Sequence, residues 1–315
     1  MKPAGLLLIA LSLAACHEVR RADSASHHSN APAALSGTFD NHEQVWRARE
    51  SATGTPPPHV VIDVEPTADA AWTIWHVRLD ANPAMDATWA MHGAAQAGGS
   101  FALTPHRSLA ATPAPSSAFD VQQWTPLDAC ALRGVGAPLK VVADTAACTA
   151  IAPGIGASAA LLPLGIEREG EWLHVRLYSD QARGADVRED AREVRWFGGW
   201  AAINGGGQKA DAASNDWHMN RGVRIGSEGG RVELQWRDGN PAGYSLALER
   251  LTYRDGNVPV IKLSVVEDSS GRVLAYSWAN PQATAIGINL GWVQVGLSRD
   301  DAPAAAPPAP ASVTK

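Results

Sequence analysis

The chain has 315 residues, of which 45% are hydrophobic and 18% are charged, with a formal net charge of −6 and a pI near 5.9. This composition is sufficient for a sizeable buried core in one large domain or two smaller ones. The acidic balance and the lack of a basic stripe exclude nucleic acid as an expected partner.

The first sixteen residues have the organisation of a bacterial export signal. Lys2 supplies a positive charge, and Gly5 to Leu13 form an apolar segment that is too short to span a bilayer stably. This segment ends in Leu-Ala-Ala-Cys, which resembles the bacterial lipobox and implies that Cys16 is lipidated. Ordinary secretion with an unmodified Cys16 is the alternative. His17, in place of Asp, favours anchoring at the outer membrane facing the periplasm, with the membrane as a partner.

Residues 17–34 are polar and small, which is typical of a flexible tether between a lipid and a folded body. Asp40 and Asn41 suit the N-cap of a short helix predicted for Glu43–Arg49, and the proline run 56–58 ends regular structure. From His59 onward, short Val-rich or alternating segments predict strands. Their regular spacing is typical of an antiparallel sandwich or barrel.

The tetrapeptide His-Val-Arg-Leu (HVRL) occurs twice, at 76–79 and at 174–177, each time inside an alternating strand. In each strand the apolar residues share one face, and the polar and aromatic residues share the other. The polar faces are Trp72, His76, Arg78 and Asp80 in the first strand, and Trp172, His174, Arg176 and Tyr178 in the second. Either these faces line one internal ligand site, or the apolar faces form the core and the polar faces meet solvent.

Export changes the interpretation of the two cysteines outside the signal segment. Cys130 and Cys148 would meet an oxidising compartment, where a disulfide between them is the simplest prediction. Closing that loop would stabilise the fold by about 3 kcal/mol. A catalytic thiol or a metal pair is the alternative, but neither cysteine has His or Asp at metal-like spacing, and no metal site is predicted.

A second run of predicted strands fills residues 190–298 and predicts a second antiparallel β domain. The charged stretch Ala185–Val194 before it is predicted to be a helical connector. Asp268–Gly271 and Arg254–Asn257 are hairpin signals. Trp200 and Trp292 stand next to glycines, and with Trp278 they indicate either a surface that stacks on a sugar or tetrapyrrole, or large-beside-small packing in a core. The Pro/Ala-rich residues 299–315 predict a disordered tail.

The segment LSGTFDNHEQVW, residues 35–46, resembles the opening of the CpcT/CpeT family of chromophore (phycobilin) lyases, in which Gly-x-Phe-x-Asn precedes a Gln-containing helix. The segment WTIWHVRLD lies where that family has a strand. Leu127 and Cys130, followed by Cys148, resemble its Leu- and Cys-containing segment. The resemblance covers residues 35–178. It implies a calycin-like, lipocalin-like antiparallel barrel, assigned to residues 35–180, that binds an open-chain tetrapyrrole.

The sequence therefore predicts an all-β protein with two β units and no required cofactor. The resemblance implies that a bilin or another hydrophobic tetrapyrrole binds at the two polar HVRL faces, stacked on Trp and held by carboxylates and Arg. Asp86–Gly93 contains no Arg where the family has an Arg-rich strand, which argues against lyase turnover and leaves catalytic residues unassigned. A non-catalytic lipocalin-like carrier or an envelope scaffold is the alternative function.

Overall fold

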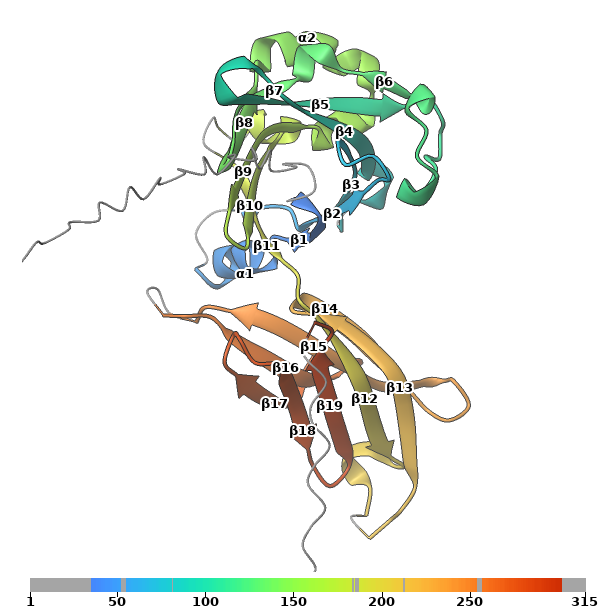
Figure 1. The fold of residues 1–315 in the computed structure, drawn as a ribbon. Coiled ribbons are helices and arrows are strands. Elements are labelled where there is room, and N and C mark those ends of the chain that lie inside the picture. Colours follow the sequence, from blue (N-terminus) through green and yellow to red (C-terminus); the bar gives the residue numbers. More distant parts are fainter. Residues whose placement is uncertain are drawn as a thin grey trace, which may run out of the picture.

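The computed structural model describes residues 35–51, 55–80, 82–182, 184, 187–211, 213–253 and 257–301. The signal segment with Cys16, the tether and the tail from 302 onward lie outside the described residues, so what the sequence predicts for them stays a prediction. The described chain is built almost entirely of antiparallel strands, which confirms the predicted fold class. It forms two β units that lie one above the other in Figure 1.

The first unit is a closed barrel of ten antiparallel strands. These strands are β1 (Gly37–Asp40), β2 (Val60–Pro66), β3 (Trp72–Leu79), β4 (Ala87–Ala95), β5 (Ser100–Ser108), β7 (Leu132–Gly136), β8 (Leu139–Ala143), β9 (Pro163–Glu169), β10 (Trp172–Leu177) and β11 (Glu189–Glu193). Their order is β4-β3-β2-β1-β11-β10-β9-β8-β7-β5, and pairing of β5 with β4 closes the ring. A short strand, β6 (Trp124–Pro126), pairs with the end of β5. Closure leaves no free edge in the ring, which removes a site of unwanted strand pairing.

The barrel interior is filled by the apolar face of each strand. Trp75 and Trp89 are completely buried there, among Val, Leu, Ile and Phe side chains. Val77, Val175 and Leu177, which are the apolar residues of the two HVRL copies, belong to the same core. The alternating strands therefore have their apolar faces inside, because removal of these side chains from water is the main driving force for closing the sheet.

Helix α1 (His42–Glu50) begins one residue before the predicted start. Its N-cap is Asn41, as expected, while the Oδ1 atom of Asp40 accepts a hydrogen bond from the backbone N–H of His42 at 2.7 Å. The helix lies on the side of the barrel that faces the second unit (Figure 1). This position brings its side chains to the junction between the two units.

Helix α2 (Thr145–Ile155) is not predicted by the sequence pattern. The Oδ1 atom of Asp144 caps it by accepting hydrogen bonds from the N–H groups of Ala146 and Ala147 at 3.0 and 3.1 Å. Ile151 and Ile155 pack against the barrel core. The helix thus lies across the end of the barrel that is remote from the second unit (Figure 1).

The second unit is a sandwich of two four-stranded antiparallel sheets. One sheet has the order β13-β12-β19-β18, and the other has the order β14-β15-β16-β17. The strands are β12 (Trp196–Asn204), β13 (Trp217–Gly226), β14 (Glu228–Gln235), β15 (Pro241–Leu251), β16 (Val260–Glu267), β17 (Val273–Ala279), β18 (Ala285–Asn289) and β19 (Val293–Arg299). Inward-facing apolar residues of both sheets form a separate core, which includes Phe197, Leu246 and Leu263.

The turn signals of the second unit have mixed outcomes. Asp268–Gly271 joins β16 to β17, the N–H of Glu267 donates to the carbonyl of Arg272 at 2.9 Å, and Gly271 has the left-handed φ of +69° that such a turn requires. The hairpin signal is therefore confirmed at this place. The other signal, Arg254–Asn257, falls largely outside the described residues.

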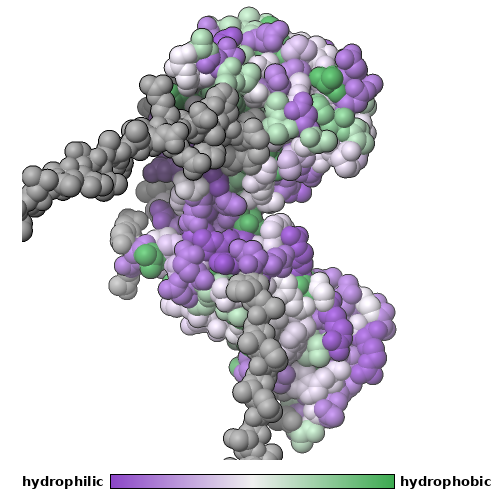
Figure 2. Space-filling view, in the orientation of Figure 1, coloured by the Kyte–Doolittle hydropathy of each residue, from purple (hydrophilic) through white to green (hydrophobic). Residues whose placement is uncertain are grey.

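The helical connector expected at Ala185–Val194 is wrong. Glu189–Glu193 forms β11, which pairs with β1 and β10 and completes the barrel. Ala191 of this strand is fully buried in the barrel core. The boundary between the two units therefore lies after Glu193, whereas the sequence pattern ended the barrel at residue 180 and began the second domain at residue 190. Hydrophilic side chains gather at the narrow waist between the units, as Figure 2 shows.

Candidate functional site

The polar face of the first HVRL strand lies outside the barrel and is occupied by local contacts. His76 Nδ1 lies 3.1 Å from the hydroxyl of Thr88, and Arg78 pairs with Asp63 at 2.6 Å. Trp72 is buried in a small cluster with Ile74, Ala90 and Trp124 on the outer surface. Asp80 pairs with His59. The structure thus places Trp72 in a small buried cluster and the other three residues in separate polar contacts on the outside of the barrel.

The polar face of the second copy lines a surface groove. Trp172 and His174 of β10 form one wall of a groove of about 660 Å³, and helix α1 forms the opposite wall. The groove is lined by Glu43, Gln44, Arg47, Glu169, Gly170, Glu171, Trp172, His174 and Asp190. In the barrel, β2, β1 and β11 separate β3 from β10, so the two polar faces do not form one site.

The groove combines an aromatic wall with carboxylates. The rings of Trp172 and His174 are nearly parallel, with an interplanar angle of 8° and centroids 6.3 Å apart. On the strand beside them, Asp190 Oδ1 lies 2.5 Å from His174 Nδ1 and 2.9 Å from the Nε atom of Arg188. The guanidinium of Arg192 lies over the Trp172 ring at 5.0 Å. These contacts fix the ring orientations before any ligand arrives.

Helix α1 is held against the barrel by Gln44. Its Nε2 atom donates to the carbonyl of Arg188 at 2.9 Å, and its Oε1 atom accepts from the N–H of Asp190 at 3.2 Å. Asn41 strengthens this link, because its amide donates to Glu189 Oε2 at 2.7 Å. The wall of the groove formed by α1 is therefore attached to β11 by main-chain and side-chain hydrogen bonds.

A cluster of buried charges lies behind the groove and joins the two units. Arg192 is about 1% exposed, and pairs with Glu43 at 2.6 Å and with Glu228 at 2.8 Å. Glu43 comes from α1 and Glu228 from the sandwich strand β14, so one arginine binds both units. The backbone N–H of Thr252, also in the sandwich, donates to Glu43 at 3.0 Å.

The protonation of this cluster is set by burial and by its arginines. Burial raises the pKa of the Glu228 carboxyl to about 7, against the opposing charge of Arg192. Burial also acts to raise the pKa of Glu171, but the hydrogen bond from Arg250 and its charge hold that pKa below the ordinary value. Glu171 pairs in addition with Arg195 at 2.9 Å. Two of the groove carboxylates, Glu43 and Glu171, are therefore already neutralised by arginines.

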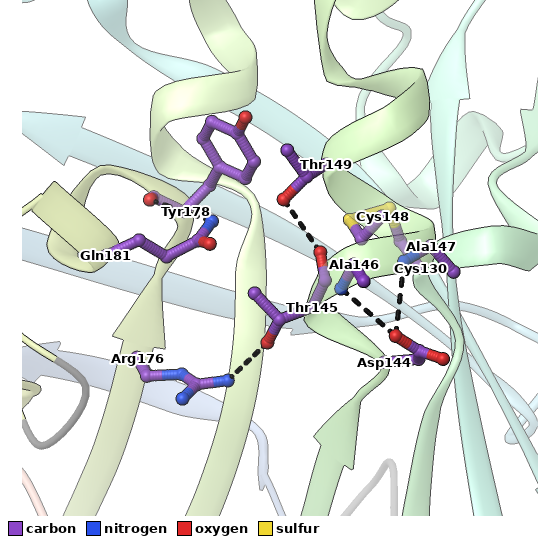
Figure 3. The surroundings of a disulfide bond; sticks show 10 residues. All are labelled: Cys130, Asp144, Thr145, Ala146, Ala147, Cys148, Thr149, Arg176, Tyr178 and Gln181. Atoms are coloured by element: carbon purple, nitrogen blue, oxygen red, sulfur yellow. Dashed lines mark hydrogen bonds between the residues drawn. A yellow bond between two sulfur atoms is a disulfide. The ribbon is translucent and has the colours of Figure 1, made fainter.

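The two remaining residues of the second strand lie beyond the groove. Arg176 lines a neighbouring hollow of about 460 Å³ that also contacts His174, and its Nη2 atom donates to the hydroxyl of Thr145 at 2.9 Å. Tyr178 packs against the barrel core. Figure 3 shows both residues beside helix α2 and the bond between Cys130 and Cys148. The predicted disulfide is thus confirmed, and it fastens α2 to the segment that precedes β7.

His59 forms a second charged cluster on the barrel surface. It bridges Asp40, at 2.7 Å from Nε2, and Asp80, which contacts Nδ1. The hydrogen bond to Asp40 raises the pKa of His59 to about 9, with burial opposing the rise and Asp80 supporting it. His59 is therefore an imidazolium at neutral pH. The ring of His42 lies 6.1 Å away, at the junction.

Stability is expected to fall as pH rises past the ordinary pKa of this histidine. Because the folded pKa of about 9 exceeds the unfolded value of 6.5, the stabilisation is complete below about pH 6.5 and is lost as pH rises through about 9. After a discount for partial exposure, the loss is about 1–2 kcal/mol. Urea denaturation of the wild type and of His59→Gln between pH 6 and 10 measures it. Equal pH profiles for the two proteins, with His76→Gln as the control, would contradict the prediction.

Sequence reasoning found Trp172 and His174 but missed the rest of the groove. Glu43, Gln44 and Arg47 lie in the predicted helix, and Asp190 lies in a stretch interpreted as a connector. The four-residue spacing of Glu43 and Arg47 places them on the same face of the helix, where they form an ion pair at 2.8 Å. This spacing is the sequence signal that indicates a charged face on α1.

In the part of the chain that the structure describes, no group of three or more His, Cys, Asp or Glu residues could hold a metal ion. Among those same residues, no helix has the length and apolarity needed to span a membrane.

No family model, no curated protein and no solved structure matches the chain.

Proposed function

We propose that the chain is a non-enzymatic binding protein of the bacterial envelope, held at the outer membrane by a lipid on Cys16, and that its ligand occupies the groove at Trp172 and His174. The observation that carries the proposal is the position of this groove beside a filled barrel. Trp75 and Trp89 occupy the barrel interior, so a carrier with an internal cavity is disfavoured. The groove has the volume of a small-molecule site and a flat aromatic wall with polar groups around it.

The side chains of the groove favour binding over covalent chemistry. None of the residues that line it carries a hydroxyl or a thiol that could act as a nucleophile. Its carboxylates Glu43, Glu171 and Asp190 are engaged with arginines or with His174, so they are poorly suited to exchange protons with a substrate. Glu169 is the most exposed acid at the rim. The groove therefore suits a ligand with a flat apolar part and hydrogen-bond donors.

A tetrapyrrole is the specific ligand class that this arrangement supports. Trp172 offers a surface for stacking, the acids Glu169 and Asp190 offer acceptors for pyrrole N–H groups, and Arg47 offers a cation for a propionate. These are the residue types that the resemblance to chromophore lyases implies, although they lie on the outer surface of the barrel. Transfer of the ligand to a protein thiol is a further step for which the groove supplies no catalytic group.

Ligand binding is tested by titrating the purified full-length chain with biliverdin and with haem, followed by Trp quenching and visible absorbance. Trp172→Ala and His174→Ala are expected to weaken binding by about tenfold each, because each removes one ring of the aromatic wall of the groove. His76→Ala is the matched control, since it changes the same position of the other HVRL copy. Equal loss in His76→Ala, or no saturable binding in the wild type, would exclude the groove as a tetrapyrrole site and favour an envelope scaffold.

The lipid anchor is tested by a single substitution. Cys16→Ser removes the only thiol in the lipobox-like segment, and the protein is expected to move from the membrane fraction to the soluble fraction. Fractionation of cells, with detection of the folded body, measures the distribution. An unchanged distribution would contradict anchoring through Cys16.

A further inference from the structure

An exposed row of aromatic side chains crosses the outer face of one sandwich sheet and reaches helix α1 of the barrel. The ring centroids of Trp46 and Tyr253 are 5.3 Å apart, those of Tyr253 and Trp278 are 5.5 Å apart, and those of Trp278 and Tyr276 are 5.7 Å apart. Tyr276, Trp278 and Tyr253 remain 61%, 56% and 42% exposed. Leaving contiguous aromatic surface in water is unfavourable, and such patches mark interaction sites.

Strand register places this aromatic row on the outer face. Trp278 and Tyr276 of β17 pair with Lys262 and Ser264 of β16, while the alternate residues of β16, such as Leu263, point into the sandwich core. The row is therefore not part of that core. By contrast, Trp292 packs against the core of the second unit, which accounts for it as a structural residue.

Polar groups run alongside the aromatic row. Glu249 lies between His42 at 3.5 Å and Lys262 at 3.6 Å, and the Nζ atom of Lys262 lies 5.9 Å from the centre of the Tyr276 ring. Aromatic rings thus stand next to charges that are paired with one another.

We propose that this aromatic row binds a polysaccharide, whose pyranose rings stack on Tyr253, Trp278 and Tyr276 while their hydroxyls bond to Glu249 and Lys262. A sugar presents flat C–H surfaces between hydroxyls that both donate and accept, so it matches apolar rings beside a carboxylate and an ammonium. The charges of the row are paired with one another, which fits a neutral chain. A membrane surface would instead favour an excess of cations around the aromatic residues.

A proline-rich peptide is a weaker fit to this surface. Such peptides dock into grooves between aromatic side chains. Here the rings of Tyr276 and Trp278 stand on the outer face of a sheet, at its edge strand β17. An extended, open row of this kind can follow a long polymer past several successive sugar units.

Binding is measured by co-sedimentation of the full-length chain with cellulose, chitin and isolated peptidoglycan. The chain is expected to sediment with at least one of them, and Trp278→Ala and Tyr276→Ala are expected to weaken binding by about tenfold. Trp278→Phe keeps a ring and is expected to restore most of the binding. Trp200→Ala is the matched control, because Trp200 is 39% exposed on β12 of the opposite sheet.

The outcomes separate the alternatives. If none of the three polysaccharides sediments the protein, or if Trp278→Ala and Trp200→Ala bind equally well, the proposal is overturned. Sedimentation with anionic phospholipid vesicles that depends on Trp278, without polysaccharide binding, would also overturn it and assign the row to a lipid surface. The aromatic row and the groove at Trp172 are separate sites. Tetrapyrrole binding can therefore be measured in Trp278→Ala and Tyr276→Ala, and polysaccharide binding can be measured in Trp172→Ala and His174→Ala.

Discussion

Replacing Arg192 with Met is expected to destabilise the protein by about 3–5 kcal/mol, which would be among the largest effects of any single substitution. Arg192 is buried and pairs with both Glu43 and Glu228, so its loss leaves Glu228 buried without its paired cation and leaves Glu43 with only the half-exposed Arg47. The cost is the penalty of unpaired buried charge, since a neutral apolar side chain of similar size still fills the space. Urea denaturation followed by Trp fluorescence measures it.

The matched control for this prediction is Arg78→Met. Arg78 pairs with Asp63, but its side chain is half exposed, so its loss is expected to cost about 1 kcal/mol or less. Adding Glu228→Gln to Arg192→Met is expected to restore part of the lost stability, because the second change removes the buried carboxylate that has lost its arginine. A destabilisation by Arg192→Met that is no larger than that of Arg78→Met would show that the buried cluster is not energetically important.

Arg192 also couples the two β units. It reaches from β11 of the barrel to Glu228 of the sandwich, and Arg250 of the sandwich reaches back to Glu171 of the barrel. Reciprocal ion pairs of this kind hold the two units in one relative position, because moving one unit against the other would break both pairs. In Arg192→Met we therefore expect faster proteolytic cleavage at the connection between β11 and β12.

The alternation of the HVRL strands was sufficient to predict the barrel strands but not the use of their outer faces. Period-two patterning identifies which residues share a face, and burial of the apolar face follows from the hydrophobic effect. Whether an outer polar face is inert or lines a groove depends on what packs beside it. His76 lies beside Thr88 of the neighbouring strand β4, whereas His174 lies opposite helix α1, which comes from more than a hundred residues earlier in the chain.

The charged stretch around Arg192 was misinterpreted because its neutralising partners are remote. A run such as Glu189 to Glu193 suggests a solvated segment when only neighbours are considered. In the structure Asn41 donates to Glu189, and Glu43 and Glu228 pair with Arg192. Helix α2 was missed for a local reason, because Pro153 and Gly154, which normally interrupt a helix, lie in its last turn, although Asp144 caps its first turn.

Removing the disulfide by Cys130→Ala and Cys148→Ala together is expected to cost about 3 kcal/mol, since the bond closes an 18-residue separation and restricts the unfolded chain. That separation includes the hairpin of β7 and β8, and the bond holds α2, which packs on the barrel core through Ile151. Thermal denaturation with and without reductant measures the effect. Reductant should lower the melting temperature of the wild type to that of the double variant and leave the variant unchanged.

Thiol titration provides the chemical control for that experiment. In a Cys16→Ser background, the denatured chain is expected to show no free thiol before reduction and two after it, because Cys130 and Cys148 are then the only cysteines. Two free thiols without reductant would mean that the bond does not form in the isolated protein. A wild-type melting temperature that reductant leaves unchanged would mean that the bond forms but that packing of α2 on the core, rather than the covalent link, closes this end of the barrel.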